Sequence, residues 1–219
     1  MEAGIRALER LGKATRITLI VFIVSTLLGL VMQFALAFVL AEPSYNSLAI
    51  YSMVGGLLSL LQLGSMIVSI VLVALWVSQA HTNLHEARLQ GLNYTPGWAT
   101  ASFFLPFVNL WVPFASTREL YNRSMGKAEW HAATSAGDVT SWYACTWAAF
   151  VMLLAISVMF FFQALPGVYV LMPDFAQVGL FLLYGLFMLG SAWFLAQVVA
   201  KVTRAQSEYQ HVAQAEVFA

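Results

Sequence analysis

The chain has 219 residues, of which 61% are hydrophobic and only 9% are charged, and its formal net charge is zero. Soluble domains carry about 25% charged residues, so this composition excludes an ordinary soluble protein and indicates an integral membrane protein. The balanced charge and the absence of a large basic block also exclude nucleic acid as a partner.

The charged residues are confined to short stretches of the sequence. No Asp, Glu, Lys or Arg occurs in five long runs, which are 17–41, 43–85, 89–117, 139–173 and 175–200. Runs of this length cannot form a surface that faces water. A chain of 219 residues has no room for a separate soluble domain, so we predict one membrane domain over 1–219.

In chain order, four segments are long and apolar enough to cross a bilayer as helices, because a spanning helix needs about 20 apolar residues. They are about 17–41, 52–80, 141–163 and 177–200. The first is too long for the h-region of a signal peptide, which has roughly 7–15 residues, so we expect it to be retained. The sequence therefore predicts an all-α protein with four transmembrane helices.

Small residues mark the faces on which these helices are expected to pack, because lipid gives apolar helices no hydrophobic reason to associate. The second span is rich in such residues: Ser52, Gly55, Gly56, Ser59, Gly64, Ser65 and Ser69. We interpret them as helix-packing positions.

The second helix is expected to continue to Gln90, with Gly91 as its C-cap. A fifth apolar segment, 97–115, follows it and is poorly built for crossing. Pro106 lies in its middle, Asn109 follows, and Pro113 is close to its end. Proline removes a backbone donor and clashes with the preceding helical turn.

The distribution of basic residues gives an independent criterion for this fifth segment. If 97–115 does not cross, all ten Lys and Arg residues lie on one side of the membrane, as the positive-inside rule requires. We therefore predict that both termini are cytoplasmic and that 97–115 is either a re-entrant segment or a pair of interfacial helices. A capping box at Ser116–Glu119 would then start a short cytoplasmic helix at about 117–126.

Two histidines form the clearest candidate metal pair. His81 and His85 are one helical turn apart, so their imidazoles share a helix face and could chelate a metal. A metal site usually needs three or four ligands, and the competing interpretation is an interfacial basic strip with Arg88 that faces lipid phosphates. The sequence contains no catalytic motif such as HExxH or GxSxG, so we expect neither an enzyme nor a cofactor.

Residues 76–123 resemble a known bacterial membrane family. Trp76 and Asn83 precede Tyr94-Thr95-Pro96-Gly97-Trp98-Ala99, and Leu105-Pro106-Phe107-Val108-Asn109-Leu110-Trp111-Val112-Pro113 leads to Arg118-Glu119-Leu120. This order and spacing resembles the family catalogued as domain of unknown function 4328. The resemblance implies a multi-pass protein of the bacterial inner membrane, and it implies no substrate or mechanism.

Two functions are compatible with these features. The first is a non-catalytic accessory or scaffolding subunit of a membrane assembly, bound to a partner protein or to a second copy of itself. The alternative is a membrane protein that binds a lipid or small molecule, with metal assistance if the histidines are ligands. The candidate binding residues are Trp76, Asn83, Pro96, Gly97, Trp98, Pro106, Asn109, Trp111, Pro113, Arg118 and Glu119.

Overall fold

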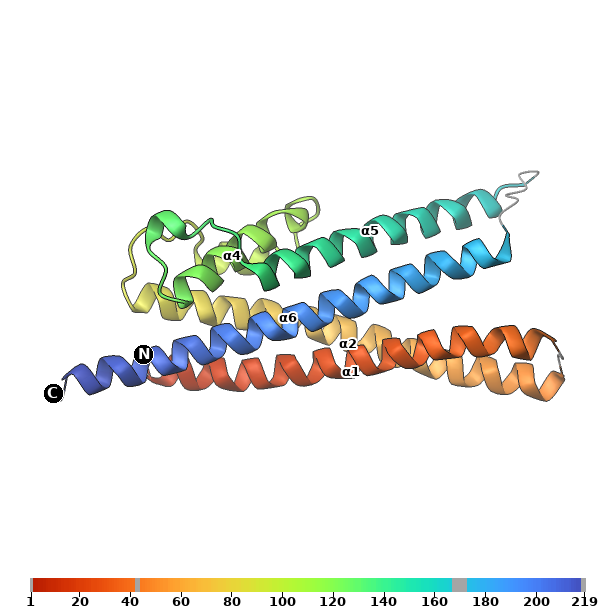
Figure 1. Ribbon diagram of the computed structural model, residues 1–219, viewed down its shortest axis with the longest axis horizontal. Helices are drawn as coiled ribbons and strands as arrows, with labels where there is room; N and C mark the ends of the chain where they lie inside the picture. Colours follow the sequence, from red (N-terminus) through yellow and green to blue (C-terminus); the bar gives the residue numbers. More distant parts are fainter. Residues whose placement is uncertain (1, 42–43, 167–172, 218–219) are drawn as a thin grey trace.

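The computed structural model describes residues 2–41, 44–166 and 173–217, with side chains described for 2–35, 44–166, 173 and 175–208. All regular structure in these ranges is helical (Figure 1). The elements are α1 (Glu2–Ala41), α2 (Tyr45–Glu86), α3 (Pro96–Ala101), η1 (Val108–Leu110), α4 (Val112–Ser124), η2 (Glu129–His131), α5 (Gly137–Gln163) and α6 (Asp174–Val217). Four of them are long and apolar enough to cross a membrane, which confirms the predicted fold class.

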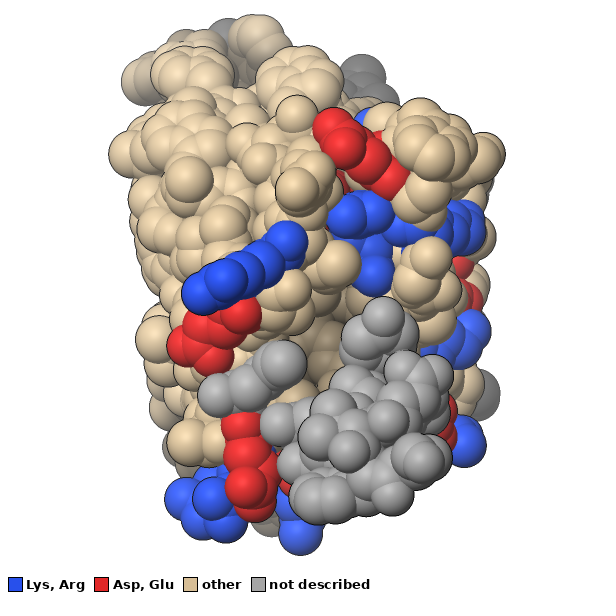
Figure 2. Space-filling model, turned by 90° about the vertical axis from the view of Figure 1, so that its left-hand side faces the viewer, with Lys and Arg blue, Asp and Glu red and all other residues tan. Residues whose placement is uncertain are grey.

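Three of the four long helices extend well beyond the bilayer. α1, α2 and α6 contain 40, 42 and 44 residues. At 1.5 Å per residue each is about 60 Å long, twice the thickness of the hydrocarbon core. Apart from Asp174, the first residue of α6, their charged residues lie in the extensions, which gather at the end of the molecule where α1 begins and α6 ends (Figures 1 and 2).

α2 begins with a capping box and ends earlier than predicted. The Ser44 hydroxyl accepts a hydrogen bond from the backbone of Ser47, whose own side chain caps Ser44 in return. The helix ends at Glu86 because Arg88 adopts a left-handed conformation, with φ of 54°. The prediction that it runs to Gln90 with Gly91 as the C-cap is therefore wrong. Gly91 is also left-handed but lies in the following loop.

The long helices are arranged side by side in the order α2, α1, α6, α5. α1 packs against both α2 and α6, and α5 packs against α6, whereas α2 and α5 make no extensive contact. The α1–α2 hairpin and the α5–α6 hairpin diverge toward the right-hand end of Figure 1. At the opposite end, α3 and α4 bridge the space between α2 and α5.

The fifth apolar segment does not cross the molecule. α3 and α4 lie at the same end as the start of α1 and the end of α6, because the chain reverses direction between them (Figure 1). This confirms the predicted proline-broken segment between the second and third long helices. α4 begins at Val112, earlier than the predicted start near 117, with Pro113 in its first turn.

The packed core lies at this same end. Only 17–33% of the residues in the most apolar window of each long helix are buried. The fully buried side chains come mainly from the C-terminal part of α2 and from α4 and α6, among them Trp76, Leu120, Val199 and Val202. The sparse burial of the apolar spans agrees with a lipid environment, where exposure of apolar side chains carries no penalty.

Candidate functional site

The central segment is held in place by Glu119, a buried carboxylate that faces a loop. Its side chain is only 3% exposed. The backbone N–H of Asn93 donates to both carboxylate oxygens at 3.0–3.1 Å, the Asn93 amide donates at 2.7 Å, and the Tyr94 N–H donates at 3.2 Å. The predicted capping box at Ser116–Glu119 is wrong, because these residues lie within α4 and Glu119 binds the loop before α3 instead.

That loop positions the start of α3. The Thr95 hydroxyl accepts a hydrogen bond from the Trp98 N–H at 3.3 Å, and Pro96 occupies the first helical turn. Proline suits this position because its missing N–H would have no partner there. Gly97 faces open space and the Trp98 ring is 45% exposed, so neither contributes to a packed site.

The tip of the segment is a tight reversal. The Val108 N–H donates to the Pro106 carbonyl at 2.7 Å, and the Asn109 N–H donates to Leu105 at 3.0 Å. Phe107 between them has φ of 62° and an 81% exposed side chain. A positive φ is costly for a bulky residue, so this reversal is a strained feature held by its surroundings.

The tip packs against α5 at the depth of the predicted third span. The Tyr143 hydroxyl donates to the Leu110 carbonyl at 2.9 Å, and the Trp111 ring meets the Trp147 ring edge-on at 5.6 Å. Trp147 lies about 9 Å along α5 from residue 141, where the predicted span begins. The tip therefore reaches past the first turns of that span.

A cavity of about 370 Å³ lies between the central segment and the four long helices, where α2 and α5 make no extensive contact with each other. Its size is within the range of about 300–1,000 Å³ that is typical of ligand pockets. All four long helices and the central segment line it: Leu19, Phe22, Met66, Ser69, Ile70, Val73, Phe103, Asn109, Leu110, Pro113, Phe114, Trp142, Tyr143, Thr146, Trp147, Phe150, Met188, Ser191, Ala192 and Leu195.

The cavity wall is apolar and largely aromatic on one side. Phe114 stacks on Tyr143 with the ring centroids 4.1 Å apart, and Trp147 meets both Tyr143 and Phe150 edge-on. Such pairs fix ring orientations beyond what burial alone provides. The α5 wall is therefore preformed.

Few polar groups line the cavity. Thr146 and Ser191 are hydrogen-bonded across α5 and α6 at 2.8 Å. The Ser69 hydroxyl is buried without a hydrogen-bond partner among the described residues, and the Asn109 side chain is exposed. A wall of this kind gives water too few partners to be well ordered, and it suits an apolar occupant.

Arg118 stands next to this wall. Its guanidinium lies over the Phe114 ring, with Cζ 5.0 Å from the centroid. The Nε atom is buried and has no acceptor among the described residues. Phe114 lines the cavity and Arg118 does not, so the guanidinium reaches the cavity wall only through its contact with the Phe114 ring.

Trp76 and Asn83 lie outside the cavity, at the packed end of the bundle. Trp76 is fully buried, and its indole N–H donates to Thr203 on α6 at 3.0 Å. The Asn83 amide donates to Gln206 at 3.1 Å and accepts from Gln79 at 2.9 Å. Gln206 in turn donates to Ser124 on α4 at 2.9 Å, so this network joins α2, α4 and α6.

The histidines are placed differently from one another. His81 is fully buried, and neither ring nitrogen makes a well-formed hydrogen bond with the described residues, although the Ser116 backbone interacts with the ring; His85 is exposed. The Nδ1 atom of His85 is 2.9 Å from the His81 carbonyl on its own helix. Within the described residues no group of three or more His, Cys, Asp or Glu is close enough to hold a metal. A metal site at His81 and His85 therefore stays a prediction, with no third ligand among the described residues.

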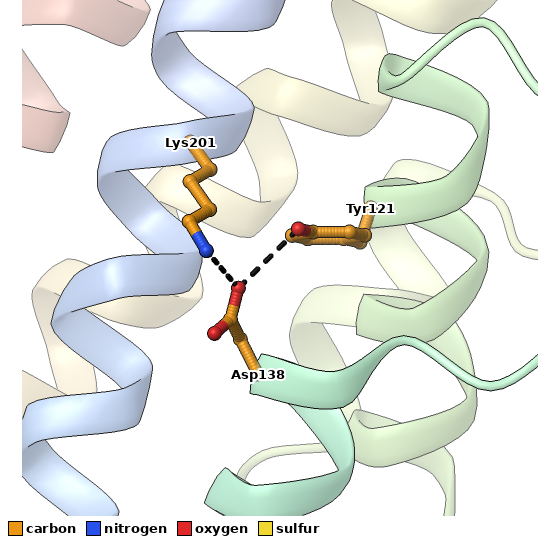
Figure 3. A network of polar contacts seen from close by, with 3 residues as sticks. All are labelled: Tyr121, Asp138 and Lys201. Carbon is orange, nitrogen blue, oxygen red and sulfur yellow. Dashed lines mark hydrogen bonds and ion pairs between the residues drawn. The ribbon is translucent and has the colours of Figure 1, made fainter.

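A second polar cluster ties α4 to the α5–α6 hairpin (Figure 3). The Lys201 amine contacts the Asp138 carboxylate at 2.5 Å, and the Tyr121 hydroxyl donates to the same oxygen at 3.3 Å. Burial raises the pKa of Tyr121 above its ordinary value, and the Asp138 charge raises it further. Tyr121 therefore stays a neutral donor at physiological pH.

The comparisons with known proteins place this architecture in a family. The family described as "Domain of unknown function (DUF4328)" matches residues 40–204. The chain belongs to the DUF4328 family. The matched range contains α2 to α5 and the apolar part of α6, and hence the whole central segment. No curated protein and no solved structure matches the chain.

In this DUF4328 protein the structure brings together only part of the predicted set of binding residues. Asn109 and Pro113 line the cavity, while Trp111 and Arg118 contact aromatic residues of its wall. Three α5 residues of the cavity wall were not predicted from the sequence: Tyr143, Trp147 and Phe150. Their spacing of four and three residues is an aromatic stripe on one helix face, which was the available signal.

Proposed function

We propose that this protein is non-catalytic and binds the acyl chain of a membrane lipid in the cavity between α2 and α5. The observation that carries this proposal is the cavity itself, which has an apolar and aromatic wall at the depth of the spans. Its described lining contains hydroxyl and amide groups but no carboxylate, imidazole or thiol, so it offers contacts for a chain and no general acid or base.

The neighbouring bilayer is the natural source of the occupant. α2 and α5 do not close against each other, so the cavity is accessible from the side of the helices that lipid surrounds. An acyl chain fills such a space without loss of hydrogen bonds, whereas water needs two to four polar partners. The central segment, which packs against Trp147, would form the end wall of the site.

A cavity-filling substitution tests this function. Ala192 on α6 is 4% exposed and lines the cavity, so Ala192→Phe places a ring in the volume that the chain would occupy. Ala155→Phe is the matched control, because Ala155 is exposed on α5 and does not line the cavity.

Native mass spectrometry of the detergent-purified proteins would count retained phospholipids. We expect Ala192→Phe to retain about one fifth of the wild-type lipid or less, since a loss of 1 kcal/mol of binding free energy corresponds to about fivefold in affinity. Ala155→Phe should retain the wild-type amount. Equal retention by all three proteins would count decisively against the cavity as the binding site. If Ala192→Phe unfolds, Ser69→Leu fills the same cavity from α2 with a smaller side chain.

The second candidate function is an accessory or scaffolding subunit. Ser52, Gly56 and Ser59 are exposed on one face of α2, and a Cβ added at Gly56 would meet no atom within 4 Å. Small residues on a lipid-facing helix allow a partner helix to approach closely. Purification in mild detergent tests this function, and a strict monomer without a co-purifying protein would argue against it.

We further propose that the protein lies in a bacterial inner membrane with both termini in the cytoplasm. All ten Lys and Arg residues would then be on the cytoplasmic side, in agreement with the positive-inside rule. A cysteine at position 130, where Trp130 is 80% exposed, would report the location of the α4–α5 loop in a Cys145→Ser background. Labelling of this cysteine from outside intact cells would overturn the orientation.

A further inference from the structure

We propose that the occupant of the cavity is an anionic phospholipid, with the guanidinium of Arg118 binding its phosphate. This inference rests on the proposed function, since it assigns a headgroup to the chain that the cavity would hold. Three properties of Arg118 favour a headgroup contact: its charge, its free hydrogen-bond donors and its position near the cavity.

Among the described residues, no carboxylate forms an ion pair with Arg118. Glu119, its sequence neighbour, is turned toward the loop before α3 and is occupied by donors from Asn93 and Tyr94. Asp138, in the first turn of α5, is paired with Lys201 and accepts from Tyr121 (Figure 3). Arg118 therefore keeps an uncompensated positive charge within the part of the chain that the structure describes.

The guanidinium also has unused donors. Neither an ion pair nor a hydrogen bond joins it to any described residue, and Nε is buried without an acceptor. A buried donor of this kind costs free energy until it is satisfied. A phosphate offers several acceptor oxygens and suits the planar fork of arginine, which binds such groups through paired hydrogen bonds.

Arg118 has the position that a headgroup contact requires. It lies one helical turn from Phe114, its guanidinium rests on the Phe114 ring, and that ring forms part of the cavity wall. The guanidinium is therefore one aromatic ring away from the apolar volume, and an apolar volume with a cation close by matches the two chemically different parts of a phospholipid. The cation–π contact holds the guanidinium beside the cavity rather than free in solvent.

Lipid competition with charge variants tests the proposal. The purified protein is equilibrated with mixed micelles that contain equal amounts of phosphatidylglycerol and phosphatidylcholine with identical chains, and the retained lipids are counted by native mass spectrometry. We expect the wild type to favour phosphatidylglycerol about tenfold, because both headgroups offer a phosphate to the guanidinium but only phosphatidylcholine adds a trimethylammonium cation that repels it. Arg118→Gln should reduce this preference to less than about twofold.

Two further variants separate this site from general surface charge and from loss of folding. Arg10→Gln removes an exposed arginine of α1 at the same end of the molecule and should keep the tenfold preference. Arg118→Lys keeps the charge and should retain part of the preference, so it tests the proposal even if Arg118→Gln unfolds. An equal loss in Arg10→Gln and Arg118→Gln would contradict a specific role of Arg118.

Two more outcomes are informative. One shows whether the anion is a lipid headgroup or free phosphate, and the other shows whether the headgroup contact fails while acyl-chain binding holds. Displacement of phosphatidylglycerol by millimolar inorganic phosphate would overturn the lipid as the source of the anion; no displacement supports it. If phosphatidylcholine is retained equally well and Arg118→Gln has no effect, the headgroup contact fails while the acyl-chain function stands. If neither lipid is retained by the wild type, both proposals fail.

Discussion

Replacing Glu119 with glutamine gives a sharp test of how the central segment is held. Glutamine keeps one carbonyl oxygen in place of the two carboxylate oxygens that accept from Asn93 and Tyr94 at 2.7–3.2 Å. Its NH₂ group would face the Asn93 donors, so at least one hydrogen bond to a charged acceptor is lost in a site that is only 3% exposed. Each such bond contributes about 1.5–3 kcal/mol.

We therefore expect Glu119→Gln to lower the free energy of unfolding by about 2–3 kcal/mol. For a chain of this size that corresponds to a drop in Tm of roughly 4–12 °C. Thermal unfolding in detergent would measure the change. Hydrogen exchange provides a local measurement, since the amides of Asn93 and Tyr94 should exchange faster in the variant while those of α5 should not.

The competing role for Glu119, as the third residue of a helix capping box, predicts a different result. Glutamine serves in a capping box as well as glutamate does, so the substitution would then be close to neutral. The exposed Glu9 of α1 provides the control, and Glu9→Gln should stay within about 0.5 kcal/mol of the wild type. A Glu119→Gln protein as stable as Glu9→Gln, with unchanged exchange at Asn93 and Tyr94, would refute the reasoning.

Two further substitutions test the packed end of the bundle. His81→Leu should raise the free energy of unfolding by about 1–2 kcal/mol, because an apolar side chain replaces a fully buried imidazole that makes no well-formed hydrogen bond with the described residues. A thermal shift downward would instead show that the interaction with the Ser116 backbone stabilises the fold. Gly12→Ala should be about 1–2 kcal/mol less stable than Gly64→Ala. A Cβ at Gly12 would lie 2.7 Å from the Thr203 hydroxyl that accepts the Trp76 hydrogen bond, whereas a Cβ at Gly64 would meet no atom within 4 Å. Equal stability of the two alanine variants in the same assay would show that the Trp76–Thr203 bond does not depend on Gly12.

The sequence predicted the architecture well because the relevant signals are local. Apolar runs of sufficient length identify spanning helices without reference to any partner, and prolines within 97–115 prevent a continuous helix. The ends of elements were predicted less well. α2 ends at Glu86 because Arg88, and not Gly91, takes up the first left-handed conformation after the helix.

The candidate site was only partly predictable. Asn109 and Pro113 line the cavity as members of the predicted binding set, but the roles of Trp76 and Asn83 depend on Thr203 and Gln206, which are more than 120 residues away in the sequence. No local pattern identifies such partners. The aromatic stripe of α5 was visible in the sequence, yet its spacing alone does not distinguish a cavity wall from a lipid-facing surface.

Charge and hydropathy restrict each stretch of the chain to water or to lipid, so the sequence alone was enough to predict a membrane protein with four candidate spans and a proline-broken central segment. Other features follow only from the folded structure. α2 and α5 make no extensive contact, and the central segment packs against Trp147. Glu119 faces a loop, while Arg118 forms no ion pair with a described carboxylate. These features arise from contacts between helices, whose order and divergence are not encoded in the polarity of any single segment.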